Sequence, residues 1–101
     1  MIKNNMRQVH PSEILKKEYL VSLGMTVNTL SIRLHVPASM VNEVIRERRG
    51  ITPDIAFRLA RFLNTTLQFW LNLQTRFDLK LTEIQLGDKI AREISPMQVV
   101  A

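Results

Sequence analysis

The feature that most constrains this chain is the stretch from Thr26 to Gly50, which reads TVNTLSIRLHVPASMVNEVIRERRG. Its apolar residues recur at steps of three and four, as they do along one face of a helix. A tight turn separates two such patterns, and a group of arginines follows the second. The stretch therefore predicts two short helices joined by a turn. Their expected inward-facing residues are Val27, Leu30 and Leu34 in the first helix, and Val41, Val44 and Ile45 in the second.

The residues at the ends of these helices support the same boundaries. Thr26 is a favourable N-cap for the first helix, and Pro37 suits the first turn of the second, which we expect to end at about Arg46 or Glu47. The turn between them usually carries a glycine in the left-handed conformation, and here that place falls to His35. Histidine is among the residues that tolerate this conformation. The result is the layout of a helix-turn-helix, in which the second helix enters the major groove of DNA.

The second helix of this motif has an outward face that suits base recognition. Asn42 could pair with adenine, Glu43 could accept from cytosine unless it is held aside, and Met40 could touch a thymine methyl group. The alternative is that this polar face and the arginines after it simply meet water. The expected base-reading residues are Ala38, Ser39, Met40, Asn42 and Glu43, and the expected phosphate-contacting residues are Thr26, Arg46, Arg48 and Arg49.

The charge of the chain is concentrated around this motif. The 101 residues include 14 Lys and Arg against 9 Asp and Glu, which gives a formal net charge of +5. Residues 7–50 carry a net charge of +3, whereas residues 76–93 hold four charges of each sign and are neutral. A basic surface beside a helix-turn-helix favours a nucleic acid as partner, although ordinary surface lysines and arginines could give the same total.

Composition also limits the class of protein. A chain of 101 residues fits one small domain, and its lack of cysteine rules out disulfides and thiolate zinc sites. No apolar run approaches the roughly 20 residues of a membrane-spanning helix, and the segment MIKNNMRQVHP lacks the apolar core of a signal peptide. We therefore expect a cytoplasmic protein without a metal or a cofactor. With no glycine-rich phosphate loop and only two distant histidines, we expect no catalytic site.

The remaining segments predict three more helices and two extended ends. Pro11 opens a helix that runs to about Leu23, Thr52 caps another, and Thr66 caps a long one. Gly87 is expected to end or bend this last helix. We thus expect an all-α fold of five helices in residues 11–94, with a flexible or extended segment at residues 1–10 and an extended tail at residues 95–101.

The long C-terminal helix carries more apolar residues than one small domain can cover. In its segment FWLNLQ, Phe69, Trp70 and Leu73 are expected core anchors, and the amides of Asn72 and Gln74 are expected to satisfy nearby backbone groups. Beyond this segment, the apolar positions spread over more than one face. They either form a self-association surface or fold back on the first helix. The residues expected at a dimer interface are Leu79, Leu81, Ile84, Leu86 and Ile90.

Taken together, these segments resemble the HigA family of antitoxins, within the wider group of lambda-repressor-like, or XRE-type, regulators. The resemblance covers residues 9–94 and rests on the helix-turn-helix, on HPSEILKKEYL before it, and on ITPDIAFRLARF and FWLNLQ after it. It implies a five-helix domain that acts as a dimer, binds a palindromic operator ahead of its own operon and represses it. It also implies a partner toxin, an RNase of the RelE-like class, that the protein holds inactive. Met40 departs from the polar or basic residue common in the family, which leaves the operator sequence open.

Two other functions fit the same segments. The chain could keep the fold and capture a toxin without reading DNA, or it could be a stand-alone regulator of the same type with no toxin. A capture module would not need arginines beside the second helix of the motif, so their presence favours DNA binding.

Overall fold

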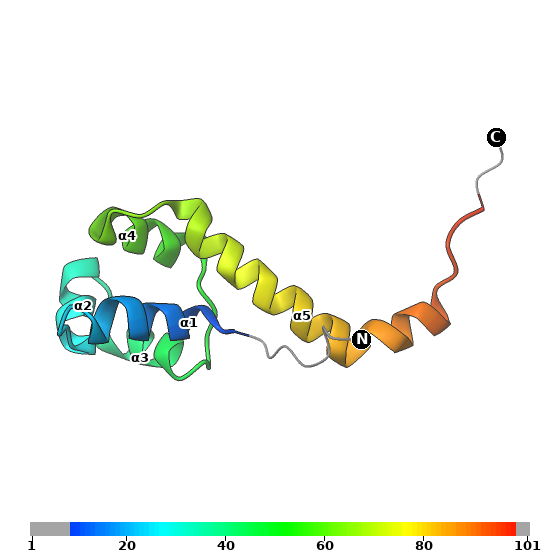
Figure 1. The fold of residues 1–101 in the computed structure, drawn as a ribbon, viewed down its shortest axis with the longest axis horizontal. Helices are drawn as coiled ribbons and strands as arrows, with labels where there is room; N and C mark the ends of the chain where they lie inside the picture. Colours follow the sequence, from blue (N-terminus) through cyan, green and yellow to red (C-terminus); the bar gives the residue numbers. More distant parts are fainter. Residues whose placement is uncertain (1–8, 99–101) are drawn as a thin grey trace.

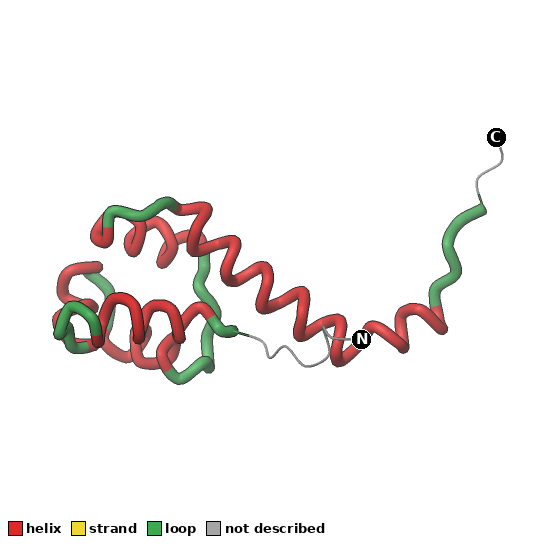
Figure 2. Tube along the Cα trace, viewed as in Figure 1, coloured by secondary structure: helices red, strands yellow, loops and turns green. Residues whose placement is uncertain are grey.

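The computed structural model describes residues 9–98, and every regular element in them is helical (Figure 2). The first two elements run directly into one another, so the described chain contains five helices. The expected all-α fold of five helices is therefore confirmed. The elements are α1 (Pro11–Ile14), η2 (Leu15–Val21), α2 (Val27–Leu34), α3 (Ala38–Ile45), α4 (Pro53–Leu63) and α5 (Leu67–Glu93).

The long helix α5 reaches well beyond the body that the other helices form (Figure 1). Its N-terminal part packs on α4 and on α1, while its C-terminal part stands clear of them. The helix does not end at Gly87, because it continues to Glu93. Its axis does change direction within the C-terminal part (Figure 1).

The described residues at both ends of the chain lie outside the helices. Residues 94–98 are not helical, and the expected tail at residues 95–101 stays a prediction. Residues 1–8 and 99–101, which were also predicted to be flexible or extended, lie outside the described residues. Within residues 9–98, no helix is both long and apolar enough to cross a lipid bilayer. No group of three or more His, Cys, Asp or Glu side chains in the same residues is placed to hold a metal ion.

The N-terminal helix is wound partly as a π-helix. In η2 the backbone hydrogen bonds join residues five apart, in place of the four of an α-helix. Leu15 and Leu20 are five apart, and both are buried, with 2% and 6% of their surface exposed. The π winding therefore turns both residues toward the core. The helix ends at Val21, two residues before the expected end at Leu23, and Leu23 is 59% exposed.

The core is built from buried residues of η2, α2, α3, α4 and the first turns of α5. Leu59 of α4 and Trp70 of α5 are completely buried, and Leu30 of α2 is nearly so. The indole Nε1–H of Trp70 donates to the hydroxyl of Thr65 at 2.7 Å, so the polar atom of the buried ring is satisfied.

The expectation that Phe69 would anchor the core is wrong. Its side chain is 37% exposed, and its ring lies edge-on against that of Trp70, with 5.0 Å between centroids. Consecutive helical residues point about 100° apart. Only one of these two aromatic side chains can therefore point into the core, and Trp70 does. Leu73, the third expected anchor, is partly buried and packs against the core.

Three threonines cap helix N-termini as predicted. Thr26, Thr52 and Thr66 precede α2, α4 and α5, and each hydroxyl oxygen accepts from the backbone N–H three residues later, at 3.0 to 3.3 Å. Pro37 is found one residue outside α3, as its N-cap, and not within its first turn. Because Pro37 lacks a side chain that can cap, α3 begins without this type of stabilisation.

The ends of the helices before α5 share a left-handed residue. The φ angles are 64° at Gly24, 59° at His35, 61° at Glu47 and 61° at Asn64. The predicted left-handed turn at His35 is thus confirmed. Such endings return a backbone N–H to the last carbonyls of the helix, and only one of the four uses the glycine that this conformation favours.

His10 caps the first helix from within the core. Its side chain is 3% exposed, and Nδ1 accepts from the Ser12 N–H at 3.1 Å. The ring also meets Phe77 of α5 edge-on, with 4.8 Å between centroids. Burial lowers the pKa of His10, and nearby carboxylates oppose this change more weakly. The neutral ring is therefore the form that accepts the hydrogen bond and joins the start of α1 to α5.

Candidate nucleic-acid interface

The eight residues of α3 present one face to the core and another to solvent. Val41 and Val44 are buried, with 3% and 2% of their surface exposed. Ser39 and Asn42 are exposed, on the side that the helical repeat predicts. Two of the expected base-reading side chains therefore point away from the protein.

Ala38 and Met40 lie at the border between these two faces. Both residues are partly buried, and the side chain of Met40 packs against the core. It lines the same small apolar space as Val41 and Leu59. Only part of the Met40 side chain is therefore left to meet a ligand.

Glu43 lies on the outward side of α3 and is ion-paired with Arg49. Its Oε1 accepts from Nε of Arg49 at 3.0 Å and lies 2.8 Å from Nη2. The side chains of Arg49 and Glu43 are 43% and 46% exposed. The sequence left open whether Glu43 meets a base or is held aside, and in the free protein Arg49 holds it.

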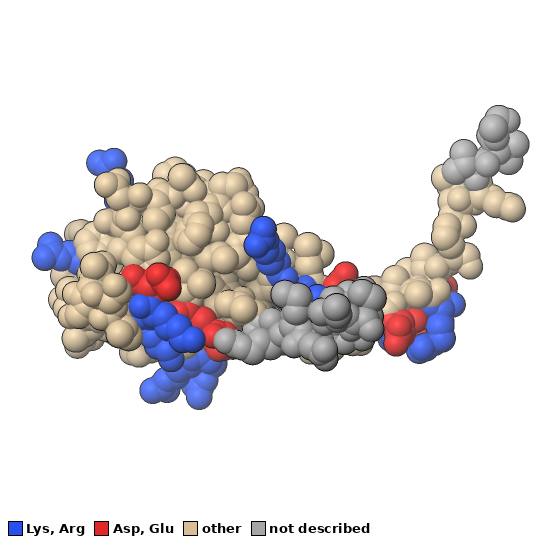
Figure 3. Space-filling view, viewed as in Figure 1, with Lys and Arg blue, Asp and Glu red and all other residues tan. Residues whose placement is uncertain are grey.

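The chain after α3 turns back on the end of the helix. Glu47 is left-handed, and the Arg48 N–H donates to the Glu43 carbonyl at 2.9 Å. This ending keeps Arg46, Arg48 and Arg49 at the C-terminus of α3, where the helix dipole favours positive charge. Arg46 and Arg48 are exposed and form no ion pair with any residue from 9 to 98. Lys and Arg side chains gather on this side of the body, near α3, with Asp and Glu beside them (Figure 3).

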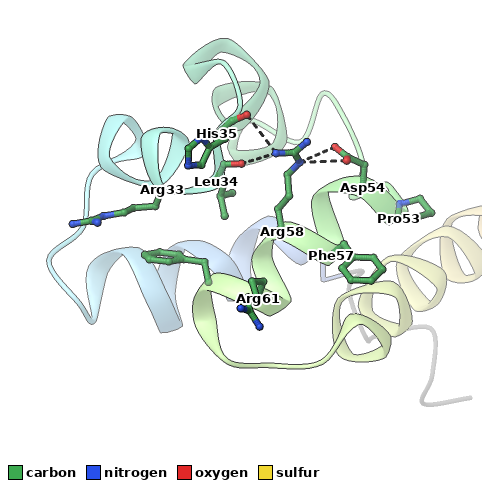
Figure 4. Close-up of a pocket in the computed structure, with 9 residues that line it drawn as sticks. Arg33, Leu34, His35, Pro53, Asp54, Phe57, Arg58 and Arg61 are labelled. Carbon is green, nitrogen blue, oxygen red and sulfur yellow. Dashed lines mark hydrogen bonds and ion pairs between the residues drawn. The ribbon is translucent and has the colours of Figure 1, made fainter.

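The turn before α3 is held by an arginine from α4. Arg58 reaches across to this turn, where its Nη1 donates to the Leu34 carbonyl at 2.8 Å and to the His35 carbonyl at 3.4 Å (Figure 4). The Nε of the same guanidinium donates to the Asp54 carboxylate at 3.1 Å. Arg58 thus connects α4 to the turn that sets the direction of α3.

Thr26, the expected phosphate contact on the other side of α3, lies at the exposed N-terminus of α2. Its oxygen accepts from the Thr29 N–H, and its O–H donates to the Thr29 hydroxyl at 3.0 Å. The positive end of the α2 dipole lies here, which suits an anion. Contact of Thr26 with phosphate stays a prediction.

The loop after α3 is tied to α5 by Gln74. The N–H of the buried Ile51 donates to Gln74 Oε1 at 2.7 Å, so the expectation that this amide satisfies a backbone group is confirmed. Gly50 leaves room for the amide, since a Cβ there would lie 2.9 Å from it. The same expectation for Asn72 is wrong, because its oxygen accepts from the Gln68 side chain at 2.8 Å.

Two contacts that hold α3 had no usable signal in the sequence. The four-residue spacing of Asp54 and Arg58 indicates an ion pair along one helix. The contact from Arg58 to a carbonyl 24 residues earlier has no local pattern. Gln74 was predicted to bind a backbone group, but nothing in the sequence indicated that this group belongs to the loop after α3.

The expected dimer residues lie on the part of α5 that stands clear of the body. Four of them are 43% to 63% exposed, so these four do not fold back on the first helix, and Leu81 is partly buried. Their place at a dimer interface stays a prediction. By the helical repeat, Leu79, Leu86 and Ile90 share one side of α5, whereas Leu81 and Ile84 continue the side that faces the core.

Comparison with known proteins assigns this geometry to a family. A helix-turn-helix family model, HTH_3, matches residues 16–70, which include α2, α3 and α4. The chain is 35% identical to antitoxin HigA-1 of Vibrio cholerae over 99 residues, which is 98% of this chain and 92% of that protein. The chain belongs to the HigA family of helix-turn-helix antitoxins.

Other proteins similar to this HigA-family chain support the assignment. A solved structure described as Pseudomonas aeruginosa antitoxin HigA with higBA promoter is 40% identical, with a TM-score of 0.88. The match covers 91% of this chain and all of that one. Virulence-associated protein I of Dichelobacter nodosus is 49% identical over 81 residues, 80% of this chain and 75% of that protein. The chain therefore has the lambda-repressor-like fold of XRE-type regulators.

Replacing Gly50 with alanine is expected to destabilise this HigA-family protein by about 1–3 kcal/mol. The added Cβ would displace the Gln74 amide and leave the buried Ile51 N–H without an acceptor. Gly87→Ala is the matched control, because no atom lies within 4 Å of a Cβ at that position. Alanine there should stabilise the helix by up to about 1 kcal/mol. Urea unfolding should give free-energy changes of opposite sign, and equal changes would contradict the role of Gln74.

Proposed function

We propose that this chain is a DNA-binding antitoxin that represses its own operon. The observation that carries the proposal is the exposed side of α3, which offers Ser39 and Asn42 to a ligand while Val41 and Val44 hold the helix on the core. An arginine-rich loop adjoins this side. Family membership adds support, because the similar Pseudomonas aeruginosa HigA was solved with the higBA promoter.

In this proposal α3 enters the major groove, and its side chains have different tasks. The amide of Asn42 pairs with adenine, and the hydroxyl of Ser39 donates to or accepts from a base edge. The small side chain of Ala38 allows close approach, and the exposed part of Met40 meets a thymine methyl group. Glu43 lies on the same side but is engaged by Arg49 in the free protein.

The phosphate strands on either side of the groove are bound by residues at the two ends of the motif. Arg46 and Arg48 project from the end of α3, while Thr26 and the first N–H groups of α2 lie on the other side. Each phosphate that these groups neutralise releases counterions, so binding should weaken steeply as the salt concentration rises.

Asn42→Ala and Arg46→Ala should weaken DNA binding in different ways. Loss of the Asn42 amide should cost about 1–3 kcal/mol at one base position and relax specificity there. Loss of the Arg46 charge should weaken binding to all sequences alike. The slope of the logarithm of the binding constant against the logarithm of the salt concentration should become smaller in magnitude by about 1. Both effects can be measured by titrating each protein variant into a duplex from the region upstream of the chain's own gene. The titration is repeated with duplexes that carry single-base changes and at several salt concentrations.

The controls for this experiment lie on the far part of α5. Thr82→Ala removes a polar side chain from an exposed helix position, and Arg92→Ala removes one positive charge. Neither should change base preference. If Asn42→Ala left every base preference intact, the assignment of the reading side of α3 would be wrong.

We further propose that the C-terminal part of α5 joins two copies of the chain. Leu79, Leu86 and Ile90 form an exposed apolar row on a helix that no other described element covers at this point. Leu81 and Ile84 widen this surface toward the body. A two-fold dimer formed here would present two α3 helices to half-sites about 34 Å apart, one turn of the duplex.

Leu86→Glu should separate the dimer into monomers. A buried leucine contributes about 1.5–3 kcal/mol, and a two-fold interface loses this twice, so the dissociation constant should rise by about 100-fold or more. Gln85→Glu adds the same charge at the adjacent exposed position and should leave the dimer intact. Sedimentation at micromolar concentration measures both variants. A wild-type chain that sediments as a monomer under these conditions would exclude this interface.

The proposed protein partner is a toxin, an RNase of the RelE-like class, which the chain binds directly and holds inactive in the cytoplasm. Support comes from membership of an antitoxin family that includes HigA-1 of Vibrio cholerae. The two other candidate functions differ in a measurable way, because a capture module binds the toxin alone and a stand-alone regulator binds DNA alone.

Co-expression with the adjacent reading frame tests the toxin half of the proposal. Expression of that frame alone should arrest growth, and co-expression of this chain should restore it. In this proposal DNA reading and toxin capture use different surfaces, so the Asn42→Ala and Arg46→Ala variants should still rescue growth although they bind DNA more weakly. An adjacent product that is harmless, or that the chain fails to neutralise, would leave the stand-alone regulator as the better description.

A further inference from the structure

The ion pair between Glu43 and Arg49 engages only one side of the guanidinium. Oε1 of Glu43 contacts Nε and Nη2 of Arg49. A guanidinium carries five N–H groups in a planar fork. Engagement of the Nε side leaves the end formed by Nη1 and Nη2 available, and this end is suited to bind two acceptors at once, such as O6 and N7 of guanine or two phosphate oxygens.

We propose that Glu43 is a positioning residue, which holds Arg49 at the edge of α3 so that its free end faces the duplex. In this assignment Glu43 contributes to base preference through Arg49 and does not itself contact cytosine. The inference rests on the proposed DNA binding and extends it by naming Arg49 as a specificity residue.

The backbone supports this role because Glu43 is bound twice by the loop that follows α3. Its carbonyl accepts from the Arg48 N–H at 2.9 Å, and its carboxylate accepts from the next side chain, that of Arg49. The left-handed Glu47 makes this return possible. Arg49 is therefore fixed relative to α3 by both its side chain and its neighbouring backbone, whereas the side chains of Arg46 and Arg48 form no ion pair within residues 9–98.

A second arginine of the same chain is bound by a carboxylate on its Nε side while the rest of its guanidinium donates to other acceptors. Arg58 has its Nε bound to the Asp54 carboxylate, and its Nη1 donates to the carbonyls of Leu34 and His35. In both arginines a carboxylate holds the Nε side of the fork. In Arg58 the other end already binds acceptors of the protein, and in Arg49 the corresponding end faces away from Glu43 on a side chain that is 43% exposed.

Simple electrostatics predicts the opposite effect of Glu43. A carboxylate near the phosphates repels them, so its removal should strengthen binding to any DNA. A positioning role predicts that removal of the carboxylate frees Arg49 and weakens the specific complex. Removal of the Glu43 carboxylate should therefore raise the affinity for the operator if charge repulsion dominates, and lower it if Glu43 positions Arg49.

Glu43→Gln tests the inference, with Glu47→Gln as the matched control. Both variants remove one negative charge near the C-terminal end of α3, but Glu47 forms no ion pair within residues 9–98. The probes are the duplex from upstream of the gene and a scrambled duplex of equal composition, at one fixed salt concentration. Glu47→Gln should strengthen binding to both probes alike. Glu43→Gln should strengthen binding to the scrambled duplex and lower the preference for the operator by about tenfold, the loss expected for one specific contact.

A double-variant cycle with Arg49→Ala completes the test. If Glu43 acts through Arg49, Glu43→Gln should lower operator preference in the wild type and have no such effect when Arg49 is already alanine. An unchanged effect in the Arg49→Ala background, confined to one base pair, would overturn the inference and assign Glu43 to direct reading of cytosine. Equal behaviour of Glu43→Gln and Glu47→Gln would also overturn it. Circular dichroism at the same temperature verifies that each variant is folded. Failure of the wild type to prefer the operator would instead contradict the proposed function.

Discussion

The burial of Val41 and Val44 decides which side of α3 faces solvent. A helix of eight residues is marginal in water, because each end leaves backbone groups unpaired and nucleation is unfavourable. Burial of two valine side chains supplies about 1.5–3 kcal/mol each, which is enough to hold such a helix against α1 and α2. Once these two residues are fixed, the helical repeat determines that Ser39 and Asn42 point outward. The candidate reading surface is therefore a consequence of core packing.

The features that the sequence predicted well are those decided within a few residues. Thr26, Thr52 and Thr66 cap helices because a hydroxyl reaches the N–H three residues later, whatever the rest of the protein does. His35 closes α2 for a similar reason, since its left-handed backbone returns the next N–H to the helix. The fold class followed from these boundaries together with apolar periodicity.

The features that the sequence did not predict depend on contacts between distant segments, or on which of two adjacent apolar residues is buried. The π winding of η2 has no signature other than the five-residue separation of Leu15 and Leu20. Phe69 and Trp70 are both suited to a core, and only the approach of α5 to the body decides between them. Asp54 and Arg58 are correctly spaced for an ion pair, but the second partner of Arg58 lies on another helix.

Polar contacts from two other helices hold α3 at both ends, and this links the reading surface to the expected dimer surface. Arg58 of α4 binds the turn before α3, and Gln74 of α5 binds the loop after it. Buried or partly buried hydrogen bonds of this kind are costly to leave unmade, so they restrict rotation of α3 within the body. Because Gln74 lies on the helix that also carries Leu86, the direction of α3 is fixed relative to the surface where two copies would meet. In a two-fold dimer, the distance between the two α3 helices would then be set by the length and direction of α5.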